Sequence, residues 1–185
     1  MYTFPQGLFT DVRIEDVSET LINLTLGELE EFRERSYTAA FIRVFDGTRW
    51  YYTSTTDPGA IQREIDTLAG YAQPNPNIED HPTVQKLQAN TGSFLEFDGQ
   101  KRCDAVPKER KLELVQGYGR MVADDELVKN WRSGYTDRRV EKRILSSKGA
   151  DLIFDFQRTG LRVVWELAEG EKHFAEMFDR SHTLV

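Results

Sequence analysis

The sequence predicts an α+β fold, made mainly of antiparallel sheets with one covering helix in each of two portions. Several stretches alternate apolar and polar residues at the period of two that a half-buried strand requires. Two stretches, about 58–71 and about 106–123, instead repeat apolar residues at helical spacing. Between them, residues 73–82 hold three prolines and break both periods. We therefore expect a strand-rich domain closed by a helix over residues 1–72, a linker and extended crossing over 73–103, and a second α+β domain over 104–185.

The first portion begins with short alternating stretches. Residues 11–15 and 20–26 predict two strands, and a turn at 27–28 leads into a charged return strand over 29–35. Ala40, Ile42 and Val44 then share one strand face before Asp46-Gly47, a pair that tolerates the positive φ of a hairpin turn. A return strand over 48–54 follows, and Asp57 with a proline after it predicts the N-cap of the first helix.

The second portion begins with an extended piece at 93–97 and a helix from about 106 to 123, whose Gly117 and Gly119 weaken it or allow close packing. Trp131, Ser133 and Tyr135 share a strand face before a predicted turn at 137–139. Another turn is expected at 147–149, and 152–156 and 161–167 predict a hairpin about residues 158–160. The piece 171–180 suits a helix or a strand equally.

The composition favours a cytoplasmic protein with no nucleic-acid or membrane partner. The formal net charge is −7 over 185 residues, so no basic surface dominates, and acidic partners are not expected. The lone Cys103 cannot form an internal disulfide, no apolar run approaches the roughly 20 residues that span a bilayer, and residues 1–6 lack the features of a signal peptide.

Few residues suggest catalytic chemistry. Cys103 has basic neighbours that could lower the pKa of its thiol, although an ordinary half-exposed cysteine is the simpler interpretation. Glu171, His173 and Glu176 could together hold a metal ion, a weak hypothesis because such spacings arise freely in a chain with 30% charged residues. No HExxH motif, phosphate loop or nucleophile turn is recognisable.

The aromatic residues of the hairpin offer a possible peptide surface. Trp50, Tyr51 and Tyr52 are consecutive, with Arg43 and Arg49 nearby, and exposed aromatics beside a strand edge suit the addition of a peptide strand. These five residues are the peptide or interface candidates. The alternative places Trp50 and Tyr52 under the helix and Tyr51 at a subunit contact.

Several motifs resemble the first domain of TldD/PmbA proteins, also called the modulator of DNA gyrase family. They are DVRIE at 11–15, LGELEE at 26–31, IRVFDGTRW at 42–50 and STTD at 54–57. VPKERKLEL at 106–114 resembles the helix that opens the middle domain of that family, and ILSSKG at 144–149 resembles a turn between its strands. Where the family usually reads Trp-Gly-(Phe/Tyr)-Ala-Ser-Thr, this sequence has WYYTST at 50–55, so Tyr51 stands in the place of a glycine.

The resemblance implies part of a zinc metallopeptidase. In that family a third, C-terminal domain holds the metal through an HExxxH motif, and the first two domains shape a dimer and its peptide cavity. We expect this sequence to stop before that domain, so it implies no catalytic residue and no cofactor here, with zinc in the missing domain. The expected partners are a family subunit, in a homo- or heterodimer, and an unfolded or extended peptide. The alternative is a stand-alone regulatory module that binds peptides or proteins without peptidase activity.

Overall fold

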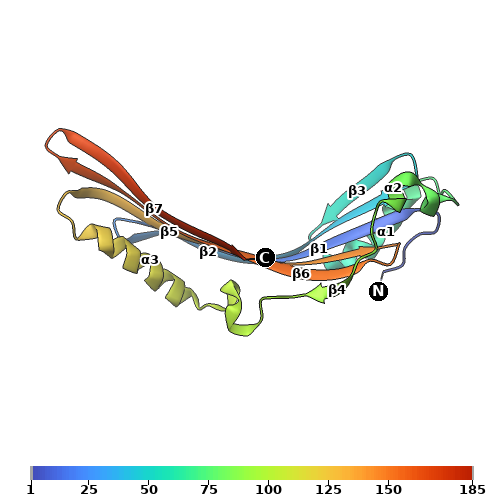
Figure 1. The fold of residues 1–185 in the computed structure, drawn as a ribbon, viewed down its shortest axis with the longest axis horizontal. Coiled ribbons are helices and arrows are strands. Elements are labelled where there is room, and N and C mark those ends of the chain that lie inside the picture. Colours follow the sequence, from blue (N-terminus) through green and yellow to red (C-terminus); the bar gives the residue numbers. More distant parts are fainter. Residues whose placement is uncertain (1, 185) are drawn as a thin grey trace. The chain divides into compact units, whose positions relative to one another are not determined.

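The computed structural model describes residues 2–184, which fold into long strands and few helices (Figure 1). The strands are β1 (Phe9–Thr25), β2 (Glu28–Phe45), β3 (Trp50–Thr55), β4 (Thr91–Phe94), β5 (Val128–Ser146), β6 (Asp151–Glu169) and β7 (Lys172–Leu184). The α-helices are α1 (Ile61–Tyr71), α2 (Pro82–Gln85) and α3 (Lys108–Ala123). Short 3₁₀ turns lie at Pro58–Ala60, Ile78–Asp80, Gly99–Lys101 and Cys103–Ala105. The predicted α+β class is confirmed. None of the helices in the described part of the chain is long and apolar enough to cross a membrane.

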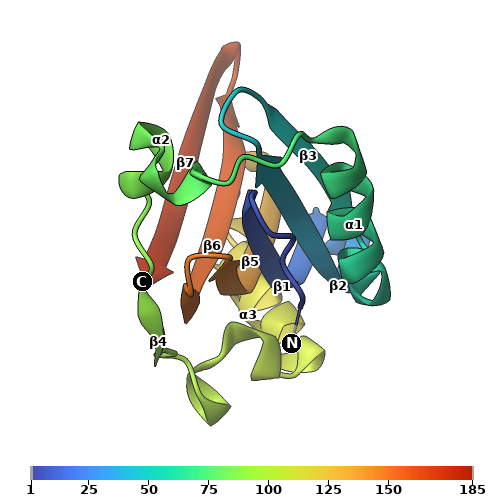
Figure 2. The same ribbon diagram turned by 90° about the vertical axis from the view of Figure 1, so that its right-hand side faces the viewer.

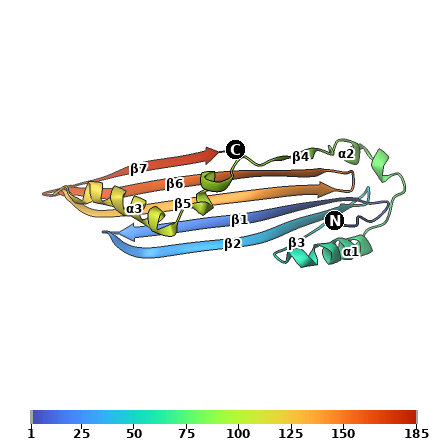
Figure 3. The same ribbon diagram turned by 90° about the horizontal axis from the view of Figure 1, so that it is seen from below.

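The described strands form one sheet in the order β3-β2-β1-β5-β6-β4, with β7 also paired to β6 (Figure 2 and Figure 3). Strand β6 has two different neighbours on one side. Its first residues, from Asp151 to Phe154, pair in parallel with β4, whereas the stretch from Gln157 to Glu169 pairs antiparallel with β7. Strands β2 and β3 pair antiparallel, with Phe45 opposite Trp50.

The strands are longer than the sequence predicted. The two short strands at 11–15 and 20–26 are parts of β1, and the predicted turns at 137–139 and 158–160 are wrong because both segments continue through β5 and β6. The hairpin assigned to 152–167 is therefore a single strand. The ambiguous piece 171–180 lies within β7. Alternation persists through each supposed turn, with Gln157 and Leu161 both buried on either side of Gly160.

The chain contacts group into two compact units. Unit 1 holds residues 1–17, 37–96 and 140–155, and unit 2 holds 18–36, 97–139 and 156–185. Each unit is assembled from three separate segments, and β1, β2, β5 and β6 contribute to both. The division into domains at residues 72 and 104 stays a prediction about the sequence.

In unit 1, helix α1 supplies the apolar cover. Ile61 and Ile65 of α1 are fully buried against Ile42 and Val44 of β2. The predicted N-cap is confirmed, since Asp57 Oδ1 accepts a hydrogen bond from the backbone N–H of Gly59 at 2.9 Å. The predicted face of alternating residues in β2 is thus the one that α1 covers.

In unit 2, helix α3 covers one face of the strands. Val115 is fully buried in a cluster with Ile22, Tyr135 and Leu161. Gly119 allows close packing, because a Cβ there would lie 2.4 Å from a ring carbon of Trp131. Residues that alternate with this buried set point to the other face of the strands, which leaves room for a surface groove.

Candidate functional site

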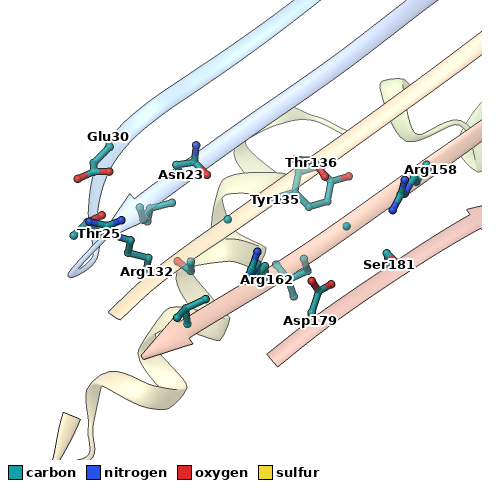
Figure 4. Close-up of a pocket in the computed structure, with 16 residues that line it drawn as sticks. Asn23, Thr25, Glu30, Arg132, Tyr135, Thr136, Arg158, Arg162, Asp179 and Ser181 are labelled. Carbon is teal, nitrogen blue, oxygen red and sulfur yellow. The ribbon is translucent and has the colours of Figure 1, made fainter. Parts of the chain in front are cut away.

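A groove of about 640 Å³ lies on the face of unit 2 that α3 does not cover (Figure 4). We call it the arginine groove, after the three residues Arg132, Arg158 and Arg162. Arg132 belongs to β5 and alternates with Trp131 and Ser133, which are buried toward α3. The other two arginines belong to β6, on either side of the buried Leu161 position. Polar residues from β1 and β7, among them Asn23 and Ser181, complete the lining.

The three guanidinium groups of the arginine groove are exposed and available. Within residues 2–184, no carboxylate lies within ion-pair distance of Arg132, Arg158 or Arg162. Arg162 donates only a weak hydrogen bond to Met177 Sδ at 3.5 Å. Two carboxylates also line the groove, Glu30 and Asp179, and Asp179 is the ladder partner of Arg162. The groove therefore carries one more positive than negative side chain.

Two glycines in the middle of the groove make room for polar side chains of the neighbouring strands. A Cβ at Gly134 would lie 2.9 Å from Asn23 Oδ1, and one at Gly160 would lie 3.0 Å from Thr136 Oγ1. Gly160 lies between Arg158 and Arg162 along β6, and the Thr136 hydroxyl from β5 occupies the space over it. Because residues four apart in a strand span about 13 Å, the two guanidinium groups start from well-separated points on the same face.

A buried polar network lies on the opposite face of unit 2, under α3. Lys111 is 2% exposed, and its Nζ lies 2.6 Å from Asp137 Oδ2 and donates to Thr20 Oγ1 at 2.8 Å. The Tyr135 hydroxyl donates to the same Asp137 oxygen at 2.8 Å, and burial together with the Asp137 charge raises the pKa of Tyr135. This network was not predicted from the sequence. Lys111 lies one helical turn before Val115, on the buried face of α3, and this spacing was the signal in the sequence that could have predicted a buried lysine.

The predicted hairpin residues lie in unit 1 and divide into two groups. Arg43 forms an ion pair with Asp11, and its guanidinium lies 4.7 Å from the centre of the Trp50 ring. The Trp50 ring stacks on Phe45 at 4.7 Å and meets Phe9 edge-on at 6.0 Å. Arg43 and Trp50 are therefore engaged in packing.

The alternative interpretation placed Tyr52 under the helix and Tyr51 on the surface, and the structure has the two tyrosines the other way round. Tyr51 is the one that packs against the core under α1, and its hydroxyl donates to Asp46 Oδ2 at 3.1 Å. Tyr52 is 69% exposed, with its ring 6.1 Å from that of Phe41. Arg49 is exposed in the loop before β3. Of the five candidates, Tyr52 and Arg49 are the ones free to contact a peptide, and that role stays a prediction.

The loop before β3 is organised by Asp46. Its Oδ1 accepts hydrogen bonds from the backbone N–H groups of Thr48 at 2.7 Å and Arg49 at 2.8 Å. Burial raises the pKa of Asp46, but these N–H groups and the Tyr51 hydroxyl outweigh burial, so its pKa is lowered overall. The predicted turn at Asp46-Gly47 thus exists as a longer loop over residues 46–49, with Gly47 at φ +94°.

Two chemical hypotheses from the sequence are wrong. Cys103 is buried, and burial, followed by the charges of Asp137 and Asp104, raises its pKa to about 11, so basic neighbours do not activate the thiol. His173 and Glu176 lie on opposite faces of β7. No group of three or more potential metal ligands occurs among the described residues, so the donors present do not fit a zinc ion.

Comparison with known proteins gives a domain family and a fold. Residues 10–72 match the family model described as PmbA/TldA metallopeptidase domain 1. Among proteins with curated functions, none matches the chain.

Three solved structures are similar over nearly the whole chain. A putative modulator of a DNA gyrase from Thermotoga maritima has a TM-score of 0.73 and 13% identity, with 95% of this chain and 39% of that chain covered. A putative modulator of DNA gyrase from Bacteroides thetaiotaomicron has a TM-score of 0.68 and 15% identity, with 94% and 40% covered. TldE from Thermococcus kodakarensis has a TM-score of 0.56 and 11% identity, with 94% and 39% covered. The chain spans about two fifths of the length of these proteins and shares their fold.

Proposed function

Because the chain carries the first domain of the TldD/PmbA family over residues 10–72, we propose that it is the non-catalytic, peptide-enclosing portion of a TldD/PmbA-type zinc metallopeptidase. In this proposal the chain assembles as a dimer with a family subunit and holds an extended peptide for cleavage by residues elsewhere. The observation that carries the proposal is the arginine groove, an open polar surface in a chain that has the fold of the family.

The groove has the properties that an extended peptide needs. Its volume of about 640 Å³ lies in the range of 300–1,000 Å³ typical of ligand pockets. Its exposed guanidinium groups can hydrogen-bond to peptide carbonyl oxygens. Among the described residues, no three potential metal ligands lie close enough together to hold a metal ion, so no step of peptide hydrolysis is assigned to them.

Two measurements test the proposal. Fluorescence anisotropy of a labelled, unstructured peptide, with EDTA present to prevent metal-dependent cleavage, should show saturable binding by the protein. Sedimentation velocity should show a dimer, with the protein alone or after addition of a family subunit. A monomer that binds no peptide would contradict the proposal. Separately, zinc-dependent peptide turnover by this chain that a chelator abolishes would contradict its non-catalytic assignment.

A stand-alone binding module is the second candidate, and the edge strand β3 favours it. Strand β3 is at one end of the described sheet, and its Tyr52 is 69% exposed beside the partly exposed Phe41. Such an edge can accept a peptide strand through backbone hydrogen bonds. A Tyr52→Ala variant that loses peptide binding, in a protein whose gene encodes no HExxxH segment, would favour this candidate over the peptidase portion.

A further inference from the structure

The arginine groove carries a charge pattern more specific than peptide enclosure requires. Resting on the proposed function, we propose that it selects extended peptides that bear two acidic side chains four residues apart. The proposal names the substrate class of the same groove. Its basis is the spacing of Arg158 and Arg162 on one face of β6, together with the lack of carboxylate partners for them among residues 2–184.

The spacing of the two arginines matches that of an extended peptide. A peptide lying along β6 rises about 3.3 Å per residue, as β6 does, so its first and fifth side chains repeat about 13 Å apart on one face. That interval equals the interval between the Arg158 and Arg162 positions. The third side chain of the peptide would lie over Gly160, beside the Thr136 hydroxyl of β5. The register therefore favours a peptide with acidic side chains at its first and fifth residues.

The charges favour carboxylates over other groups. A planar guanidinium forms paired hydrogen bonds with a carboxylate, and none of the three arginines in the groove has such a partner among the described residues. Arg132 on β5 adds a third guanidinium beside the same path. The overall charge of −7 disfavours long polyanions such as nucleic acid, whereas a short peptide meets only the local field.

The two carboxylates of the groove sharpen the expected selectivity. Asp179 is the ladder partner of Arg162 and competes with an incoming acidic side chain. Glu30 lies at the start of β2, on the side of the groove with Thr25 and Arg132 (Figure 4). An acidic side chain placed next to either carboxylate would be repelled, so charge alone is not sufficient and its position along the peptide matters.

The test uses three labelled seven-residue peptides and the intact protein in EDTA. One peptide has glutamate at its second and sixth residues, one has glutamine at both, and one has glutamate at its second and third. By anisotropy in low salt, the spaced-glutamate peptide should bind about tenfold more tightly than the glutamine peptide, because two exposed charge pairs contribute. It should also bind more tightly than the peptide with adjacent glutamates.

Single substitutions test whether Arg158 and Arg162 are the residues that bind the glutamates. Arg158→Gln and Arg162→Gln should each weaken binding of the spaced-glutamate peptide about three- to fivefold, and Asp179→Asn should strengthen it. Arg120→Gln is the matched control, since Arg120 is exposed on α3, outside the groove, and hydrogen-bonds to the backbone carbonyl of Gln116. Circular dichroism of every variant establishes that all of them are folded.

The outcomes separate the inference from the proposed function. Equal binding of all three peptides would overturn the inference and leave peptide enclosure standing, whereas binding of none would overturn both. An equal loss in Arg120→Gln would also overturn the inference, because the effect would then come from overall charge. Displacement of the peptide by a single-stranded oligonucleotide at lower concentration than by unlabelled peptide would assign the arginines to a nucleic acid.

Discussion

The buried pair of Lys111 and Asp137 offers the sharpest test of how unit 2 is held together. Replacing Lys111 with methionine preserves most of the side-chain volume and removes the ammonium group. Asp137, whose side chain is 1% exposed, then keeps the hydrogen bond from the Tyr135 hydroxyl, and its other oxygen already lacks a partner among the described residues. The variant therefore leaves a buried carboxylate without a counter-charge.

The size of the effect follows from burial. Removing one partner of a buried ion pair costs about 3–5 kcal/mol, because the remaining charge is left unpaired in a poorly polarisable interior. For an m-value of about 2 kcal/mol per molar urea, the midpoint of unfolding should fall by about 1.5–2.5 M. The same replacement at Lys108, which is exposed on the first turn of α3, should change the free energy of unfolding by less than about 0.5 kcal/mol.

Urea titration followed by far-UV circular dichroism measures these changes. The double variant Lys111→Met/Asp137→Leu removes the stranded charge and should be more stable than Lys111→Met alone, since apolar side chains often replace a buried pair without loss. A midpoint shift of less than about 0.5 M for Lys111→Met, at the precision of linear extrapolation, would refute the reasoning. So would a double variant less stable than the single one.

Three further predictions concern single positions. Gly119→Ala should lower the free energy of unfolding by about 1–3 kcal/mol through overlap with Trp131, whereas Gly117→Ala, with nothing within 4 Å, should raise it by about 0.5–1 kcal/mol; urea titration measures both. Alkylation of Cys103 by iodoacetamide should be slow at pH 8 in the native protein and quicken up to its pKa of about 11. Because this pKa is raised in the folded state, the thiol stabilises the fold below about pH 8.5 and that contribution is lost as pH rises toward 11. Fast alkylation at pH 8 would contradict this. Asp46→Ala should cost about 1–3 kcal/mol in thermal unfolding, because the backbone N–H groups of Thr48 and Arg49 lose their charged acceptor; an unchanged melting temperature would contradict this role.

The sequence predicted those elements whose signals come from residues close together in the chain. The α+β class, both helices, the buried face of β2 and the Asp57 cap depend on neighbouring residues, and the structure has all of them. The strand lengths could not be predicted in the same way. Asp137 reads as a turn residue because nothing nearby neutralises it, but its partner Lys111 lies 26 positions earlier, on α3. Gly160 reads as a turn for a similar reason, although in the structure it leaves room for the Thr136 hydroxyl of the neighbouring strand.

The candidate site is non-local as well. The arginine groove combines side chains from β1, β2, β5, β6 and β7, and its arginines are separated by up to 30 positions, from Arg132 to Arg162. No spacing rule links such residues before the strand order is known. The aromatic hairpin attracted attention because its residues are consecutive, and the structure divides them between the core and the surface.

The interleaved assembly of the two units limits how this protein can be taken apart. Each unit draws on three stretches of sequence, and four strands run from one unit into the other. Any single cut in the middle of the gene would therefore remove strands from both units and expose unpaired strand edges, which promote aggregation. Expression of either half alone should yield insoluble material. Recombination between relatives should accordingly favour exchange of the whole 185-residue segment over exchange of either part.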